Sequence, residues 1–112
     1  MSKHMQLTVT IRPYYQRDLE GAYPGLERHL RHLDPVLAKS NPSLFDLVGQ
    51  LDQVLPRFEG TQFAQVFSRH REKLRDLHKR IKEHIADWKL AQADRLLYEM
   101  EDLFDEMETE FQ

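Results

Sequence analysis

From residue 44 onward, apolar side chains recur at every third or fourth position, and this spacing constrains the fold more than any other feature of the chain. Because an α-helix completes a turn in about 3.6 residues, side chains at this spacing share one helix face. Helices with one apolar face bury it against each other, and short connections favour antiparallel neighbours. A chain of 112 residues is long enough for one such domain. The pattern therefore predicts an antiparallel helical bundle.

Four stretches carry the helical pattern, and the breaks between them fall at residues that start or stop helices. The first covers residues 17–39 and is expected to break at Pro24-Gly25, because proline lacks a backbone donor and glycine weakens a helix. The second begins after Ser43 and the third, which is long, after Thr61; both residues are good N-caps. A last break near residues 87–90 is expected before the C-terminal helix.

The two longest predicted helices carry opposite charges. Residues 69–82 hold seven basic side chains, whereas the last helix is rich in Asp and Glu and has Arg95 as its base. An antiparallel hairpin would lay the acidic C-terminal half beside the basic start of its neighbour, so we expect ion pairs across it. Each exposed pair contributes only about 0.2–1 kcal/mol to the free energy of unfolding, so these pairs would specify how the two helices align more than they would stabilise the fold. The apolar seam of the long helix is expected to run from Phe63 to Trp88.

A different pattern precedes the helices. Residues 6–12 alternate apolar Leu7, Val9 and Ile11 with polar side chains, and Pro13 follows. Alternation with β-branched residues predicts one short strand that the proline ends. A lone strand cannot pair its own backbone, so it either pairs with another chain or is the remainder of a sheet in a larger protein. We favour the second interpretation.

The chain thus divides into three parts. Residues 1–5 show no periodicity and are interpreted as a remnant of the expression vector. Residues 6–15 form the strand and a linker, and residues 16–112 form the helical bundle. The predicted fold class is all-α: an antiparallel helical bundle of three to four helices with one short N-terminal strand.

Composition excludes several classes of protein. The chain is 40% hydrophobic and 31% charged, too apolar for a disordered chain, and no run has the length of a transmembrane helix. Sixteen basic and nineteen acidic residues argue against nucleic-acid binding, and no membrane binding is expected. The absence of Cys excludes disulfides, thiolate zinc sites and thiol catalysis. No secretory signal is visible, so we expect a cytoplasmic protein.

Neither a metal site nor a catalytic site is predicted. His29 and His32 stand three residues apart and could reach one ion, but a structural zinc site needs about four ligands and no others are evident. The serines lack the context of a nucleophile, Ser43 is better used as a cap, and the four glycines form no phosphate loop. We therefore expect no catalytic residues, no metal, no cofactor and no enzymatic activity.

One stretch suggests a family. Residues 87–103, Asp-Trp-Lys-Leu-Ala-Gln-Ala-Asp-Arg-Leu-Leu-Tyr-Glu-Met-Glu-Asp-Leu, resemble the C-terminal helical (lid) region of bacterial Hsp70-type, DnaK-like chaperones. In that family a helix follows a short Asp-Trp-type turn and continues as Ala-x-x-Leu-Leu-x-x-Leu-x-x-Leu. The order of a strand, a kinked helix and a bundle is similar too. The resemblance implies a chaperone fragment whose ATPase and peptide-binding β-domain lie outside this chain.

Two functions follow as expectations. The first is a non-catalytic lid or accessory domain of an Hsp70-type chaperone, which covers or modulates client binding by the missing β-domain. The alternative is a stand-alone helical adaptor or scaffold that mediates protein–protein interaction or oligomerisation. The expected partner is a protein: a client polypeptide, the chain's own missing β-domain, a helical partner or a second copy. The predicted partner-contact residues are Leu7, Ile11, Tyr14 and Tyr15.

Overall fold

The computed structural model describes residues 4, 5, 7–15 and 17–111, and within them every regular element is a helix. The predicted all-α class is therefore confirmed for this part of the chain. Positions 1–3, 6, 16 and 112 lie outside the described residues, and with them parts of the predicted vector remnant, the first residue of the predicted strand and both ends of the predicted bundle. Among the helices that are described, none combines the length and the apolar character needed to cross a membrane.

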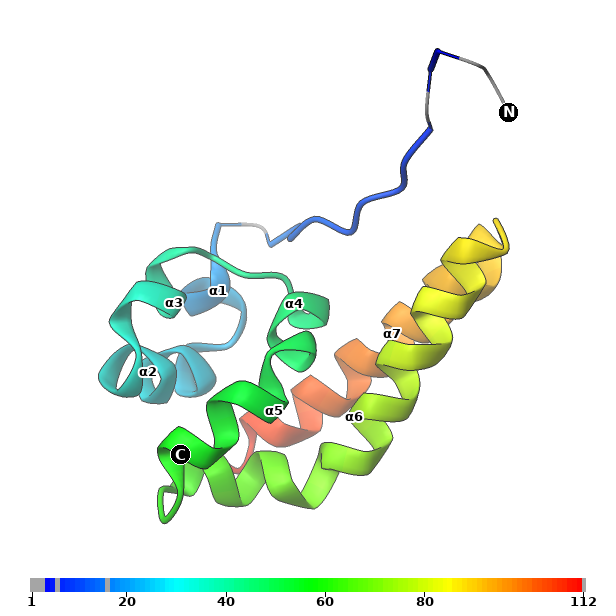
Figure 1. The fold of residues 1–112 in the computed structure, drawn as a ribbon. Coiled ribbons are helices and arrows are strands. Elements are labelled where there is room, and N and C mark those ends of the chain that lie inside the picture. Colours follow the sequence, from blue (N-terminus) through cyan, green and yellow to red (C-terminus); the bar gives the residue numbers. More distant parts are fainter. Residues whose placement is uncertain (1–3, 6, 16, 112) are drawn as a thin grey trace.

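The helices are shorter and more numerous than the three to four predicted (Figure 1). They are α1 (Leu19–Ala22), α2 (Pro24–Leu33), α3 (Pro35–Lys39), α4 (Leu44–Gly49), α5 (Leu51–Val54), the 3-10 helix η1 (Leu55–Phe58), α6 (Gln62–Ala86) and α7 (Leu90–Glu108). The predicted break at Pro24 is confirmed, and a second one falls at Asp34-Pro35. There the Asp34 carboxylate accepts a hydrogen bond from the Leu37 amide and caps α3.

Two predicted N-caps are confirmed. The Ser43 hydroxyl accepts a hydrogen bond from the Asp46 amide at 3.0 Å and starts α4, and the Thr61 hydroxyl accepts one from the Ala64 amide at 3.2 Å and starts α6. Each cap satisfies an amide in the first turn that has no partner inside the helix. Caps are local features, which is why the sequence alone identifies them.

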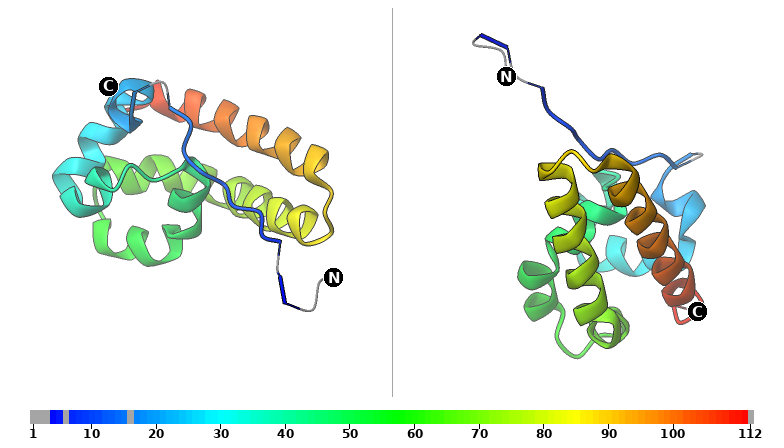
Figure 2. Two further views of the ribbon diagram at one scale, coloured as in Figure 1. Left: turned by 90° about the horizontal axis from the view of Figure 1, so that it is seen from above. Right: turned by 90° about the vertical axis from the view of Figure 1, so that its right-hand side faces the viewer.

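Helices α6 and α7 form a long hairpin with its turn at residues 87–89, where a break was predicted. Trp88 occupies this turn with a φ of 58°, in the left-handed region that bulky residues seldom adopt. Its side chain is 56% exposed, so its predicted place in the apolar seam is wrong. The helix has ended at Ala86, and the turn carries the indole out of the helical register. The turn end of the hairpin extends past the short helices (Figures 1 and 2).

The core lies between the short helices and the other half of the hairpin. Its centre is a group of four fully buried phenylalanines: Phe63, Phe67, Phe104 and Phe111. The rings of Phe63 and Phe67 lie 4.6 Å apart, and the ring of Phe111 contacts both at about 6 Å. Offset and edge-on aromatic pairs at such distances add to the stability that burial supplies. The start of α6 and the end of the chain are thereby packed together.

The Glu108 carboxylate joins the end of α7 to the start of α2. It accepts hydrogen bonds from the amides of Gly25 and Leu26, the latter at 2.9 Å. Helix α2 has no side-chain cap of its own at Tyr23, so these bonds satisfy two of its free amides and place a negative charge at the positive end of the helix. A Cβ on Gly25 would lie 2.8 Å from a Glu108 oxygen, so the absence of a side chain permits this approach.

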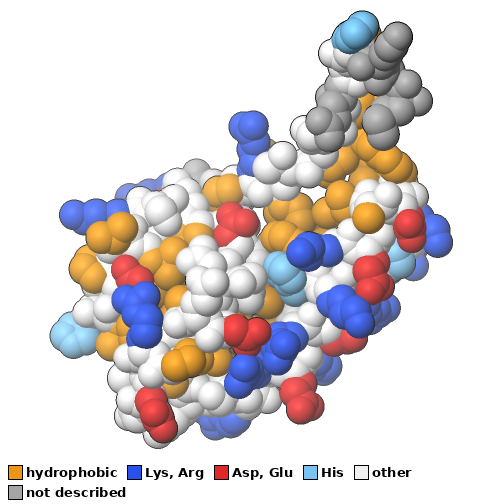
Figure 3. Space-filling view, in the orientation of Figure 1, with side chains coloured by type: hydrophobic (Ala, Val, Ile, Leu, Met, Phe, Trp, Pro, Cys, Tyr) orange, Lys and Arg blue, Asp and Glu red, His pale blue; other side chains and the backbone are white. Residues whose placement is uncertain are grey.

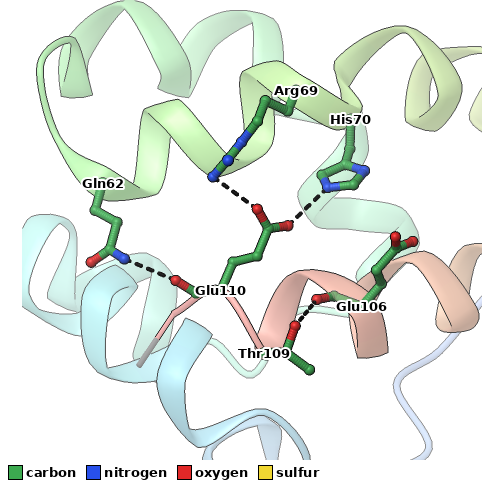
Figure 4. Close-up of polar contacts among 6 residues, drawn as sticks. All are labelled: Gln62, Arg69, His70, Glu106, Thr109 and Glu110. Carbon is green, nitrogen blue, oxygen red and sulfur yellow. Dashed lines mark hydrogen bonds and ion pairs between the residues drawn. The ribbon is translucent and has the colours of Figure 1, made fainter.

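The neighbouring Glu110 binds the start of α6 instead (Figure 4). Its carboxylate contacts Arg69 at 2.8 Å and the His70 ring at 3.0 Å, while its backbone carbonyl accepts a hydrogen bond from the Gln62 side chain at 2.8 Å. The Arg28 guanidinium also donates to the Phe111 carbonyl at 3.2 Å. Residues 108–111 are therefore tied to both α2 and α6.

Helices α6 and α7 lie side by side, but among the described residues the ion pairs expected across the hairpin form only at Arg69 and His70, which bind Glu110 just past the end of α7. Farther along α6, Arg71 and Arg75 pair with Asp52 of α5, at 2.7 and 3.6 Å. Most acidic side chains of α7 are exposed and form no ion pair with the described residues of α6, so complementary charge along the sequence does not bring them into contact.

The predicted strand is not confirmed over the part of it that the structure describes. Residues 7–12 run extended past α4 and toward the turn end of the hairpin, and no strand pairs with them in the described chain (Figure 2). A β-ladder requires a neighbouring strand, which the described residues do not provide. Of the three alternating apolar residues, Ile11 packs against the helical core, whereas Leu7 is 81% and Val9 39% exposed.

We predict that Glu108→Gln destabilises the fold by about 1–2 kcal/mol, because it replaces a charged acceptor at the start of α2 with an amide that presents a donor to a backbone N–H. Chemical denaturation measures this change in the free energy of unfolding. Glu106→Gln is the matched control, since this exposed side chain forms no ion pair with a described residue. Equal effects of the two substitutions would contradict the proposed role of Glu108.

Candidate functional site

Three of the four predicted partner-contact residues line one cleft. Ile11, Tyr14 and Tyr15 form one wall, between the extended segment and helices α4 and α7. Leu7 is not among the lining residues and remains exposed nearer the turn end of the hairpin. The cleft has a volume of about 470 Å³ and includes polar and apolar walls. We call it the tyrosine cleft, after the tyrosines that line it.

All four tyrosines of the sequence line this cleft: Tyr14, Tyr15, Tyr23 and Tyr98. They come from three parts of the chain, the extended segment, the end of α1 and the middle of α7. Apolar side chains complete the walls, among them Leu44, Phe45, Leu97 and Met100. Figure 3 shows apolar side chains gathered where the extended segment meets the hairpin. The convergence of every tyrosine on one hollow distinguishes it from the rest of the surface.

Two of these tyrosines are fixed by hydrogen bonds. The Tyr15 hydroxyl donates to the Pro42 carbonyl at 2.7 Å, and the Tyr23 hydroxyl donates to an Asp105 carboxylate oxygen at 2.9 Å. Burial raises the pKa of both hydroxyls well above the ordinary value, and nearby carboxylates raise each pKa further. Both rings therefore serve as neutral, anchored walls of the cleft.

The other two tyrosines present open rings. The side chain of Tyr14 is fully exposed, and that of Tyr98 is 63% exposed. Neither hydroxyl is hydrogen-bonded to another residue within the described part of the chain. Packing among the described residues leaves all of the Tyr14 side chain and most of the Tyr98 side chain uncovered, so both rings can contact a ligand or partner.

Acidic side chains of α7 lie beside the rings. Asp94 and Glu101 line the cleft together with Tyr98, and Asp105 follows one turn beyond. Positions 94, 98, 101 and 105 are spaced by four, three and four residues and therefore share one helix face. Partial burial raises the pKa of Glu101, and repulsion by Asp105, Asp102 and Asp94 raises it further.

The cleft also has one basic residue, Arg12, on its rim. Within the described residues, its guanidinium forms no ion pair with Asp94, Glu101 or any other carboxylate, and these two carboxylates have no basic partner at ion-pair distance. The cleft therefore combines exposed aromatic rings with negative charge that the described chain leaves without a bonded cation.

Two other hollows offer less to a ligand. One lies between η1 and the start of α6 and includes Arg69, which is already bound to Glu110. The other lies between α4 and α6, where the Arg71–Asp52–Arg75 ion pairs and the His78 ring occupy the surface. His78 stacks on Phe45 with 4.1 Å between ring centres, and burial lowers the pKa of its ring.

The histidines considered for metal binding lie apart from the cleft. The His29 ring packs against Phe111 with 5.2 Å between centres, and burial lowers its pKa, with Arg28 adding to the effect. His32 is exposed on α2. In the described part of the chain, no three His, Asp or Glu side chains are grouped closely enough to hold a metal ion.

Sequence reasoning missed part of this site. It selected Ile11, Tyr14 and Tyr15 for their place near a predicted strand, but it did not select Tyr23, Tyr98 or the carboxylates of α7. The spacing of Asp94, Tyr98, Glu101 and Asp105 on one helix face was a detectable signal. What the sequence could not supply was the position of the extended segment, which brings Tyr14 opposite that face.

Tyr15→Phe is expected to reduce the loss of stability above pH 10. Because burial raises the pKa of the Tyr15 hydroxyl above the ordinary tyrosine value of 10.0, the unfolded state loses this proton first as the pH rises. The unfolded state then binds fewer protons than the folded state, and the free energy of unfolding falls with pH. The variant lacks this contribution, worth up to about 1.4 kcal/mol per pH unit. Denaturant melts of both proteins from pH 8 to 11 measure the two slopes; identical slopes would contradict the prediction.

No family model, no curated protein and no solved structure matches this chain. The proposals below therefore depend on the arrangement of its own residues. The features that carry them are the exposed extended segment, the open tyrosine rings and the acidic face of α7.

Proposed function

We propose that this chain is a non-catalytic, helical protein-binding module that contacts its partner through residues 7–14 and the tyrosine cleft. The observation that carries the proposal is the state of this segment. It is extended, it exposes Leu7 and Tyr14, and no backbone hydrogen bond joins it to another described residue. Exposed apolar side chains beside free backbone donors and acceptors are the features that allow a segment to add to another protein surface.

The helical body supports this proposal by holding one end of the segment in place. Ile11 packs against the core and Tyr15 is hydrogen-bonded to Pro42, so residues before them are anchored on one side. Anchoring lowers the entropy that the segment loses when a partner binds. Apolar residues of the segment are therefore presented at a defined place on the surface rather than on a free tail.

A more specific second proposal is the lid or accessory domain of an Hsp70-type chaperone. The stretch that resembles that region coincides with the turn at residues 87–89 and about the first three-quarters of α7, the turn-then-helix order that the resemblance implies. In this proposal the extended segment continues into the chaperone's β-domain, which is then the partner, and the module works in the cytoplasm. The alternative partner is an unrelated protein bound by the same surface, or a second copy.

Site-specific cross-linking tests the proposed surface. We expect a photoreactive benzoylphenylalanine at position 14 to cross-link a protein in lysate of the native host, because Tyr14 is exposed within the proposed interface. Val36 on α3 is the matched control position, since it is also exposed and apolar but lies outside the cleft. Mass spectrometry of the products identifies the partner.

The position dependence decides the outcome. A product formed at position 14 but not at position 36, and lost when unlabelled wild-type chain competes, supports the binding module. If that product contains a β-domain joined to an actin-like ATPase, it supports the chaperone proposal. Equal products at the two positions, or none at position 14, would contradict the proposed surface.

A further inference from the structure

We propose that the tyrosine cleft binds an arginine or lysine side chain presented by a partner protein. This inference rests on the proposed function, and it adds the chemistry of the partner. It is carried by the open rings of Tyr14 and Tyr98, by the carboxylates of Asp94 and Glu101, and by the absence of a bonded cation among the described residues.

The rings are suited to a cation. The face of an aromatic ring carries partial negative charge, so an ammonium or guanidinium group placed over it is attracted. Arginine adds a planar surface that stacks on a ring, and tyrosine offers its hydroxyl as an acceptor as well. Because Tyr15 and Tyr23 are held by hydrogen bonds, the walls of the cleft are formed before a ligand arrives.

The charge around the cleft selects the same ligand class. Asp94, Glu101 and Asp105 share one face of α7, and Asp102 adjoins it. Partial burial raises the pKa of Glu101, repulsion by Asp105, Asp102 and Asp94 raises it further, and a bound cation would relieve this repulsion. A phosphate or an acidic lipid surface would be repelled by the same charges, so this face does not suit nucleic acid or an anionic membrane.

The shape of the site favours a side chain on a protein over a small free cation. The cleft is open along the extended segment, where Leu7 and Val9 continue its apolar surface beyond the rings. A partner with a basic residue next to apolar residues could place the basic side chain in the cleft and the apolar side chains against Leu7 and Val9. A second copy that presented its own cleft is less suited, because it would bring the same acidic face to the contact.

The charge of Arg12 offers a test of whether the cleft binds a cation. It stands on the rim of the cleft without an ion pair to the described carboxylates, and its positive charge opposes an incoming cation. Removing this charge is therefore expected to strengthen binding of a basic partner. If the cleft were only a gap in the packing, removing the charge of Arg12 would not increase the affinity for a basic partner.

A matched pair of peptides tests the proposal on the full chain. The probe is a fluorescein-labelled peptide of alternating leucine and arginine, and its counterpart carries citrulline at each arginine, which keeps the shape and removes the charge. We expect the arginine peptide to bind about tenfold or more tightly than the citrulline peptide by fluorescence anisotropy. Sodium chloride should weaken its binding. Equal binding of the two peptides, or no binding of either at millimolar concentration, would overturn the proposal.

Variants locate the site. Glu101→Gln should weaken binding of the arginine peptide about three- to tenfold, and Tyr98→Leu about two- to fivefold. Arg12→Gln should strengthen it about twofold or more. Glu99→Gln, which changes the net charge equally but lies outside the cleft, should change it less than twofold. Equal losses in Glu99→Gln and Glu101→Gln would show attraction to the whole acidic helix and reject the cleft. Circular dichroism checks that each variant is folded.

The cross-linking experiment separates this proposal from the function on which it rests. If position 14 cross-links a partner that Glu101→Gln leaves unaffected, the binding module stands and the cation site is wrong. If the arginine peptide binds and depends on Glu101 but position 14 yields no product, the cleft binds cations and the proposed protein interface is wrong.

Discussion

The contact of the Glu108 carboxylate with the first amides of α2 organises the molecule. Helix α2 has 10 residues and no cap of its own, and a helix of this length is only marginally stable without tertiary contacts. The carboxylate supplies both hydrogen-bond acceptors and the charge that the helix start favours. Gly25 permits the approach, and Phe111 follows within the same turn to pack on α6. The short helices are thereby attached to one end of the hairpin, and the opposite end extends free of them.

This asymmetry creates the site. If the short helices covered the whole length of α7, its acidic face and Tyr98 would be buried or paired. Instead they cover mainly the half near Glu108, and the extended segment and the start of α4 lie beside the part that carries Asp94 and Tyr98. The cleft is the space left between a helix with an unpaired acidic face and a segment that is anchored at Tyr15. Its aromatic rings and its negative charge therefore have separate structural origins.

Much of the helical architecture could be predicted from the sequence because its signals are local. Apolar spacing located α6 and α7, and the caps Ser43 and Thr61 located two helix starts. The errors concern pairings between distant residues. Alternation at residues 7–12 specifies a two-faced extended segment but does not say whether a sheet or a helical hairpin will meet it. Opposite charges on α6 and α7 do not specify which faces meet, since rotation of either helix by a quarter turn removes the contact.

In the candidate site, too, local features could be predicted from the sequence, whereas contacts between distant residues could not. Tyr14 and Tyr15 were selected from their position, whereas Tyr98 belongs to the site only because of where the chain folds. In the sequence, Glu108 is one carboxylate among many on an acidic helix. Its role depends on a contact with Leu26, which lies 82 residues earlier in the chain.

That separation has a consequence for the order of folding during synthesis. Translation proceeds from the N-terminus, so α2 leaves the ribosome long before Glu108 exists, and its free amides are then met only by water. The α6–α7 hairpin needs contacts that are closer in sequence and can form as soon as α7 emerges. The bonds that Glu108 forms with the start of α2 must therefore wait until residue 108 has been made, and α2 lacks these acceptors during that interval.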